Sequence, residues 1–144
     1  MRTVRDDSGT HYILLKESAE SSLVRDPTTG TERHLPNDEI EAVDGESPLV
    51  TAAGAVPEGV RTVLTAAHDE RALGLLVELD TRGPLSVEAL TGSYDLCESD
   101  LHGLLAEFRA AGLVREADAA GRRGYATTET ASQAIDALRG YSNN

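Results

Sequence analysis

The segment from Glu98 to Ala111 constrains the fold more than any other part of the sequence. Its apolar residues recur at the i, i+3, i+4, i+7 spacing that lies on one face of an α-helix: Leu101, Leu104, Leu105 and Phe108. Gly112 follows directly, and a glycine at this place commonly ends a helix. The pattern predicts a helix with one buried face and one polar face.

Three further helices are expected before this segment. Apolar residues at helical spacing begin at about residue 58 and predict two helices, the second of which ends at Arg82-Gly83-Pro84. Ser86 can cap a short third helix, because its side chain can accept a hydrogen bond from the first turn. Residues 92–96 then form a tight turn.

A hairpin and a last helix are expected after Gly112. Residues 113–115 and 124–126 are β-prone and predict two short strands around a loop at 117–123. Thr128 can cap a final helix, whose apolar residues are Ala131, Ala134, Ile135 and Leu138.

The first third of the chain has strand character instead. The runs 11–15, 22–25 and 31–35 are β-prone, and residues 26–30 contain the Pro and Gly typical of a hairpin turn. We therefore predict an α+β chain. Residues 1–46 form a small N-terminal antiparallel β-meander of three or four strands, 47–57 form a linker, and 58–144 form a mainly helical domain.

The element order of the second region is that of a winged helix-turn-helix, and its residues resemble those of MarR-like and ArsR-like regulators. The short helix and turn match at Leu85, Leu90, Tyr94 and Leu96, the recognition helix at Leu101, Leu105 and Phe108, the wing entry at residues 111–114, the wing tip at 121–124, and the strand and cap beyond it at Tyr125 and Thr128. The resemblance implies a transcriptional regulator that binds double-stranded DNA as a homodimer.

The same resemblance implies candidate contact residues. Those for DNA are Ser99, His102 and Arg109 on the recognition helix, and Arg115, Arg122 and Arg123 around the wing. Those for the dimer interface are Val60, Val63, Leu64, Ile135 and Leu138, and the same stripes are equally compatible with a core. Two features depart from the family pattern: the recognition helix carries three acids and one Arg, and Cys97 stands where a Ser or Thr cap is usual.

The charge composition and the cysteine content indicate the cellular environment of the protein. The chain has 25 acidic and 13 basic residues, a net charge of -12 and a single Lys, Lys16. Acid-rich, Lys-poor composition resembles that of cytoplasmic proteins of extreme halophiles. One cysteine excludes an internal disulfide, and no apolar stretch resembles a signal peptide or a membrane span. We expect a cytoplasmic protein with no membrane partner.

Other functions are weaker alternatives. A winged helix can serve as a protein-interaction or dimerisation module without contacting DNA. Cys97 could act as a redox sensor, but a small, half-buried helix cap or core residue is the simpler interpretation. Glu98 with His102 could hold a metal, but a polar helix surface is the simpler interpretation. The sequence shows no motif of an enzyme or a cofactor site, so we expect no catalytic residue, metal or cofactor. The N-terminal sheet could support the fold or sense a ligand, but it contains no pocket motif, and the sequence identifies no small-molecule ligand.

Overall fold

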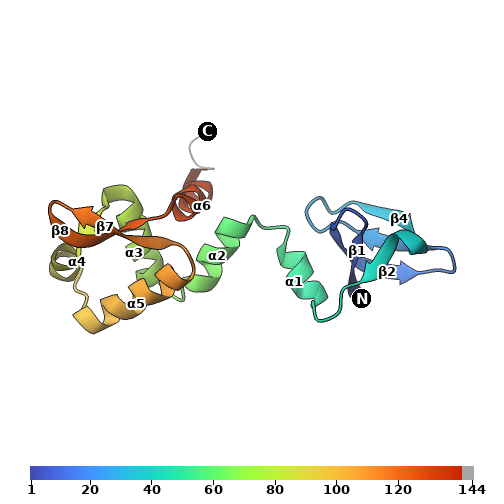
Figure 1. Cartoon of the computed structure of the whole chain (residues 1–144), viewed down its shortest axis with the longest axis horizontal. Helices are drawn as coiled ribbons and strands as arrows, with labels where there is room; N and C mark the ends of the chain where they lie inside the picture. The colour runs from blue at the N-terminus through green and yellow to red at the C-terminus, as the bar shows by residue number, and fades with distance from the viewer. Residues whose placement is uncertain (141–144) are drawn as a thin grey trace. The chain divides into compact units, whose positions relative to one another are not determined.

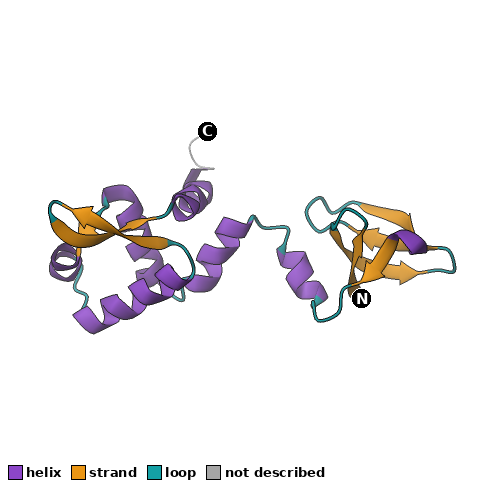
Figure 2. Cartoon of the chain, in the orientation of Figure 1, coloured by secondary structure: helices purple, strands orange, loops and turns teal. Residues whose placement is uncertain are grey.

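The computed structural model describes residues 1–140 and forms two compact units, Met1–Pro57 and Glu58–Asn144. Residues 141–144, which the sequence assigned to the second domain, lie outside the described part. Strands dominate the first unit, and helices with one hairpin make up the second (Figure 2). Among the described residues, no helix is long and apolar enough to cross a membrane.

The first unit is a five-stranded antiparallel sheet in the order β4-β3-β2-β1-β5 (Figure 1). The strands are β1 (Arg2–Asp6), β2 (His11–Glu17), β3 (Ser21–Arg25), β4 (Glu32–Pro36) and β5 (Ile40–Ala42), and the 3-10 helix η1 (Asn37–Glu39) precedes β5. Strand β1 pairs with both β2 and β5, and Val4, Tyr12, Leu14 and Val24 form the core. The prediction of three or four strands was therefore too low.

The expected linker at 47–57 is also wrong in part, because it contains helix α1 (Pro48–Ala53). Ser47 caps this helix by accepting a hydrogen bond from the Leu49 amide at 3.1 Å, and Pro48 occupies the first helical position, where its fixed φ suits a helix. Sequence periodicity missed the helix because six residues are too few to show a repeat.

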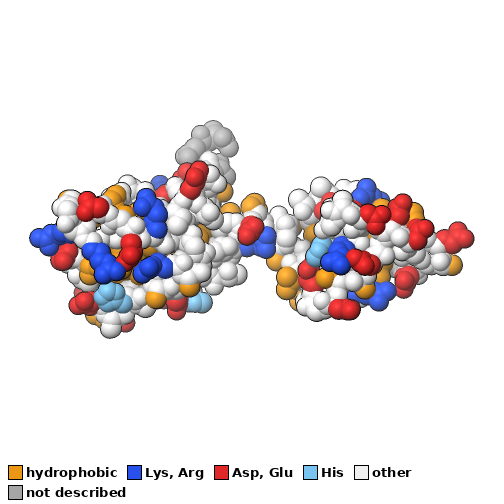
Figure 3. All heavy atoms as spheres, in the orientation of Figure 1, with side chains coloured by type: hydrophobic (Ala, Val, Ile, Leu, Met, Phe, Trp, Pro, Cys, Tyr) orange, Lys and Arg blue, Asp and Glu red, His pale blue; other side chains and the backbone are white. Residues whose placement is uncertain are grey.

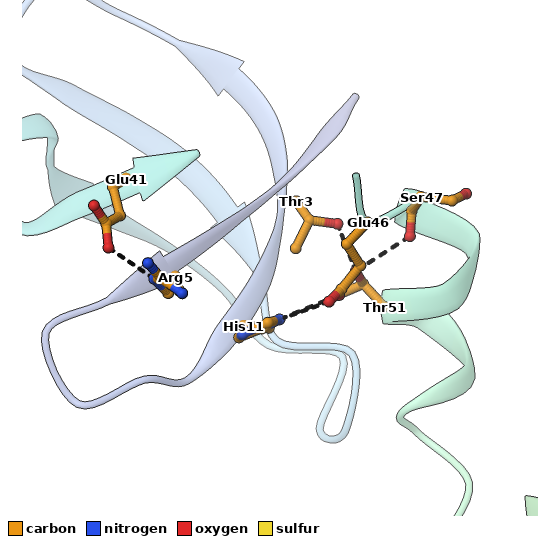
Figure 4. A network of polar contacts seen from close by, with 7 residues as sticks. All are labelled: Thr3, Arg5, His11, Glu41, Glu46, Ser47 and Thr51. Carbon is orange, nitrogen blue, oxygen red and sulfur yellow. Dashed lines mark hydrogen bonds and ion pairs between the residues drawn. The ribbon is translucent and has the colours of Figure 1, made fainter. Parts of the chain in front are cut away.

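A network of polar side chains connects α1 to the sheet (Figure 4). The buried Thr51 hydroxyl donates to the Glu46 carboxylate, so Thr3 Oγ1 is the donor in its 2.5 Å contact with Thr51 Oγ1. His11 Nδ1 lies 3.1 Å from the same carboxylate. The Thr51 hydrogen bond, followed by His11, lowers the pKa of Glu46 below its ordinary value. The carboxylate thus connects α1 with β2, and through Thr51 with β1.

The second unit packs five helices around a small sheet. The helices are α2 (Glu58–Ala66), α3 (Glu70–Arg82), α4 (Val87–Ser93), α5 (Glu98–Ala110) and α6 (Glu129–Gly140); the sheet order is β6-β8-β7, with β6 (Leu85–Ser86), β7 (Val114–Ala119) and β8 (Arg122–Thr127). Ser86 accepts from the Ala89 amide at 3.1 Å and Thr128 from the Ala131 amide at 3.2 Å, so both predicted helix caps are confirmed.

The apolar stripes of α2 and α6 are used mainly inside this unit. Val63 and Ile135 are 0% and 1% exposed in the shared core, so they offer no surface to a second copy and their assignment to a dimer interface is corrected. Val60 and Leu138 are partly buried against the same core, whereas Leu64 stays 58% exposed. Packing within one chain explains four of the five residues.

The hairpin is longer and tighter than predicted. Residues 117–123 were expected to form a loop, but β7 and β8 extend to a two-residue turn at Ala120 and Gly121. Both residues have positive φ, +54° and +82°, which matches the twist of a two-stranded hairpin. Alanine rarely adopts this conformation, so the sequence carried only half of the usual turn signal.

We expect Glu46→Gln to weaken the attachment of α1. Loss of the charge-assisted hydrogen bonds should lower the free energy of local opening of α1 by about 1 kcal/mol, measured by amide hydrogen exchange on the full chain. Because the pKa of Glu46 is lowered in the folded state, this contribution is complete above the ordinary carboxyl pKa and is lost as the pH falls through the lowered value. The difference between wild type and variant should therefore disappear in acid.

Glu41→Gln is the matched control for this experiment. Glu41 pairs with Arg5 at 2.7 Å with a 66% exposed side chain, and its ion pair joins β5 to β1 without touching α1. The protection of α1 should be unchanged in this variant. Equal opening of α1 in both variants would contradict the role given to Glu46.

We expect Gly124→Ala to destabilise the second unit. A Cβ at this position would lie 2.5 Å from the Leu85 carbonyl oxygen and 2.8 Å from Ala119 Cβ, so β6 and β8 could not keep their spacing. The cost should be about 1–3 kcal/mol, seen as a lower midpoint of thermal unfolding by circular dichroism at 222 nm. Gly103→Ala, whose Cβ would meet open space on α5, should instead raise that midpoint slightly.

Candidate nucleic-acid interface

Helix α5 is held from one side only. Leu101, Leu105 and Phe108 are at most 1% exposed, which confirms the predicted buried face. The opposite face is exposed and includes both Ser99 and His102. The apolar spacing thus orients the helix, and its polar face is not covered by the protein's own second unit.

The turn before α5 is fixed by contacts to α3. Tyr94 donates its hydroxyl to Glu78 Oε1 at 2.8 Å, and the Arg82 guanidinium both hydrogen-bonds that hydroxyl and lies 5.6 Å from the ring centroid. The Glu78 hydrogen bond raises the pKa of Tyr94. Leu96 is buried and the next residue, Cys97, begins the capping of α5. The position of the turn therefore sets where the helix begins.

Cys97 has the capping role that the sequence suggested. Its thiol accepts from the Asp100 amide at 3.4 Å and lies 3.4 Å from the Ser99 hydroxyl. The residue is exposed rather than half-buried. Sulfur is a weak acceptor, so this cap is weaker than the Ser or Thr usual at such a position.

The four candidate arginines lie on the surface of the last turn of α5 and the wing. Arg123 Nε is 3.0 Å and Arg109 Nη1 3.9 Å from the same oxygen, Glu116 Oε1. The Arg123 hydrogen bond, with the charges of both arginines, lowers the pKa of Glu116 and in turn raises that of Arg123. Glu116 thus brings the end of α5 and the wing to one surface.

The other two arginines are separate from this cluster. Arg122 Nη1 lies 3.6 Å from Glu88 Oε2 on α4, and both side chains are largely exposed. Arg115 is exposed on β7 and has no ion-pair partner within residues 1–140. Figure 3 shows basic side chains over the hairpin and the neighbouring part of α5, with acidic side chains among them.

The contacts of Glu88 and Glu116 with these arginines were not predicted from the sequence. Glu116 faces Tyr125 across the hairpin, which places Arg123 diagonally opposite. That proximity depends on the strand register, and the register depends on the unpredicted turn at Ala120 and Gly121. A hairpin drawn with a two-residue turn would have revealed the pair.

His102 and Glu98 have the spacing proposed for two metal ligands. In the structure His102 Nε2 lies 3.4 Å from Glu98 Oε1, an i, i+4 contact between exposed side chains. Within the described residues, no group of three or more His, Cys, Asp or Glu side chains is arranged to hold a metal ion. Glu98 and His102 therefore form a contact on the surface of α5.

The chain matches solved structures and a family model. Part of the chain is similar to the transcriptional regulator HlyU from Vibrio vulnificus CMCP6, with 30% identity, a TM-score of 0.47, and coverage of 56% of this chain and 84% of that one. No curated protein matches the sequence significantly. A family model matches residues 1–139, across both units, and the chain therefore belongs to a family of unknown function, DUF7346.

Proposed function

We propose that the second unit binds double-stranded DNA and that the protein acts in the cytoplasm as a transcriptional regulator. Helix α5 would enter the major groove, and the β7–β8 wing would contact the adjacent backbone. The observation that carries this proposal is the shared contact of Arg109 and Arg123 with Glu116, because it puts guanidinium groups of both elements on one exposed surface. The proposal gives the chain no catalytic step and no cofactor.

The candidate residues have different roles in this arrangement. Arg115, Arg122 and Arg123 would bind phosphates, which fixes the position of the protein without reading the sequence. Ser99 and His102, on the exposed face of α5, would donate to base edges or phosphates. Specificity would depend on α5, and much of the affinity on the wing.

Charge makes the proposal dependent on salt. From Glu58 to the end the chain has 14 acidic residues and eight arginines, so the proposed DNA-binding unit carries a net charge of -6. At 1 M salt the Debye length is about 3 Å, and long-range repulsion between this unit and DNA is screened. Contacts at hydrogen-bond distance persist under these conditions. The halophile-like composition therefore fits a protein that binds DNA through short contacts in concentrated salt.

We further propose that the protein is a homodimer, as two-fold symmetric operators require. Leu64 is 58% exposed on α2, and the exposed part of a large apolar side chain gains stability when a second copy covers it. Val60 and Leu138 would contribute their uncovered atoms. In this proposal the dimer contact is made by the exposed residues of the apolar stripes of α2 and α6, and the buried residues Val63 and Ile135 take no part.

A protein-interaction module without DNA contact is the second candidate. The observation that favours it is the local pairing of three of the four arginines with Glu88 and Glu116, which reduces the positive charge offered to phosphates. The two candidates differ in their requirement for nucleic acid, so binding assays separate them.

Replacement of both wing-tip arginines tests the DNA proposal. We expect Arg122→Ala with Arg123→Ala to weaken binding to genomic DNA fragments by at least about tenfold in molar potassium chloride, because two phosphate contacts are lost. Footprinting and gel retardation measure this. Arg2→Ala, an exposed arginine of the first unit, should leave the affinity unchanged. If the wild type protects no fragment at this salt concentration, the interaction-module function replaces the proposal.

Replacement of Leu64 tests the dimer. Multi-angle light scattering should give twice the chain mass for the wild type and the monomer mass for Leu64→Asp, because a buried unpaired carboxylate opposes association. Leu49→Asp is the control, since Leu49 is 81% exposed on α1 in the first unit. A wild type that is monomeric at every concentration would exclude the dimer, and dissociation by the control alone would place the interface elsewhere.

A further inference from the structure

A groove of about 370 Å³ lies in the second unit between α3 and the turn that precedes α5. It is lined by Arg71, Gly74, Leu75, Glu78, Tyr94 and Leu96, and its surface is mainly apolar. Leu75 and Leu96 are buried and belong to the core cluster, so they form the floor of the groove. The volume falls within the range of small-molecule sites.

Gly74 keeps this groove open. It lies inside the 13-residue helix α3, and a Cβ built on it would meet nothing within 4 Å. Glycine inside a helix costs about 1 kcal/mol relative to alanine, and neither its backbone conformation nor a close neighbour requires it here. The missing side chain leaves the space of the groove beside Gly74 unfilled.

The two ends of the groove differ in charge. Arg71 is exposed and, within residues 1–140, has no ion-pair partner, although acidic residues outnumber basic ones in this chain. Glu78 is engaged by Tyr94 and Arg82. Arg71 and Glu78 are seven residues apart, about 10 Å along one face of α3. An anionic group therefore finds an available guanidinium at only one end.

We propose that this groove binds a small amphipathic carboxylate. Its head group pairs with Arg71, and its apolar body lies over Gly74, Leu75 and Leu96. A carboxylate suits a guanidinium because two parallel N–H groups can donate to its two oxygens. The apolar body gains from leaving water when it covers the leucine floor.

The position of the groove connects ligand binding to α5. Tyr94 and Leu96 line it, and Cys97 at the start of α5 directly follows Leu96. A ligand that wedges against the turn would shift the start of the helix relative to α3. If the unit binds DNA as proposed above, the carboxylate is an effector that changes DNA affinity; ligand binding itself does not depend on that function.

Octanoate and its uncharged isostere octanamide are suitable probes, titrated into the full-length protein and followed by ¹⁵N NMR. Octanoate should shift the amides of residues 71–78 and 94–97 and bind about tenfold more tightly than octanamide, because the charge-assisted hydrogen bonds are absent with the amide. Arg71→Gln should remove this preference. The control Arg115→Gln removes an unpaired arginine elsewhere on the unit and should preserve it.

Gly74→Leu places a side chain in the groove, and its Cβ would meet no atom within 4 Å. Leucine also has a higher helix propensity than glycine, so the variant is expected to fold. It should lower octanoate affinity by about tenfold or more, whereas Gly92→Leu, with equally open space on α4, should not. Absence of shifts in these segments, equal affinity of both probes, or unchanged binding in Gly74→Leu would overturn the proposal. If the amide signals of residues 71–78 and 94–97 instead move with protein concentration in the absence of octanoate, a second copy of the chain covers the groove. That result would also overturn the proposal.

The same samples separate this inference from the proposed function. Octanoate binding that follows the pattern above, in a protein that binds no DNA, would support the groove and reject the regulator. DNA binding by a protein whose NMR spectrum does not respond to octanoate would support the regulator and reject the ligand groove.

Discussion

The second unit depends on the burial of one face of α5. A 13-residue helix is marginal in water by itself, so packing rather than helix propensity fixes it in place. Each fully buried Leu or Phe side chain contributes about 1.5–3 kcal/mol of transfer free energy, and Leu101, Leu105 and Phe108 are all in this state. The direction of these three side chains also fixes the direction of the exposed face, because a helix with one buried face cannot rotate about its own axis.

The sequence predicted the elements whose apolar residues recur at regular spacing. It did not predict the elements that form through contacts with residues far away in the chain. Helices α2 to α6 and the caps Ser86 and Thr128 follow from apolar spacing and local hydrogen bonding, which the chain encodes within a few residues. Strand β1 has little hydrophobicity of its own and forms because β2 and β5 pair with it. Helix α1 is held on the sheet by the contact of Thr51 with Thr3, which is 48 residues away in the sequence, and no local pattern reveals this contact.

The candidate surface was also predicted only in part: the exposed residues follow from the sequence, and their contact partners do not. Recognition-helix and wing residues were assigned from their order in the chain, and the structure leaves them exposed. Their carboxylate partners Glu88 and Glu116 could not be assigned, since each belongs to another element and contacts depend on register and packing. Val63 and Ile135 show the converse limit: an apolar stripe has the same spacing whether it faces the core or another subunit.

The Glu46 and Glu116 carboxylates differ in burial, and this difference suits them to different roles. The Glu46 side chain is 24% exposed and bonds Thr51, which is itself buried, so breaking the network leaves polar groups without water. The Glu116 side chain is 40% exposed and that of Arg123 75%, and ion pairs so open to solvent contribute about 0–1 kcal/mol. Water or another anion can replace Glu116 at little cost. The first network is therefore suited to holding a helix on a sheet, and the second to exchanging its carboxylate for a phosphate.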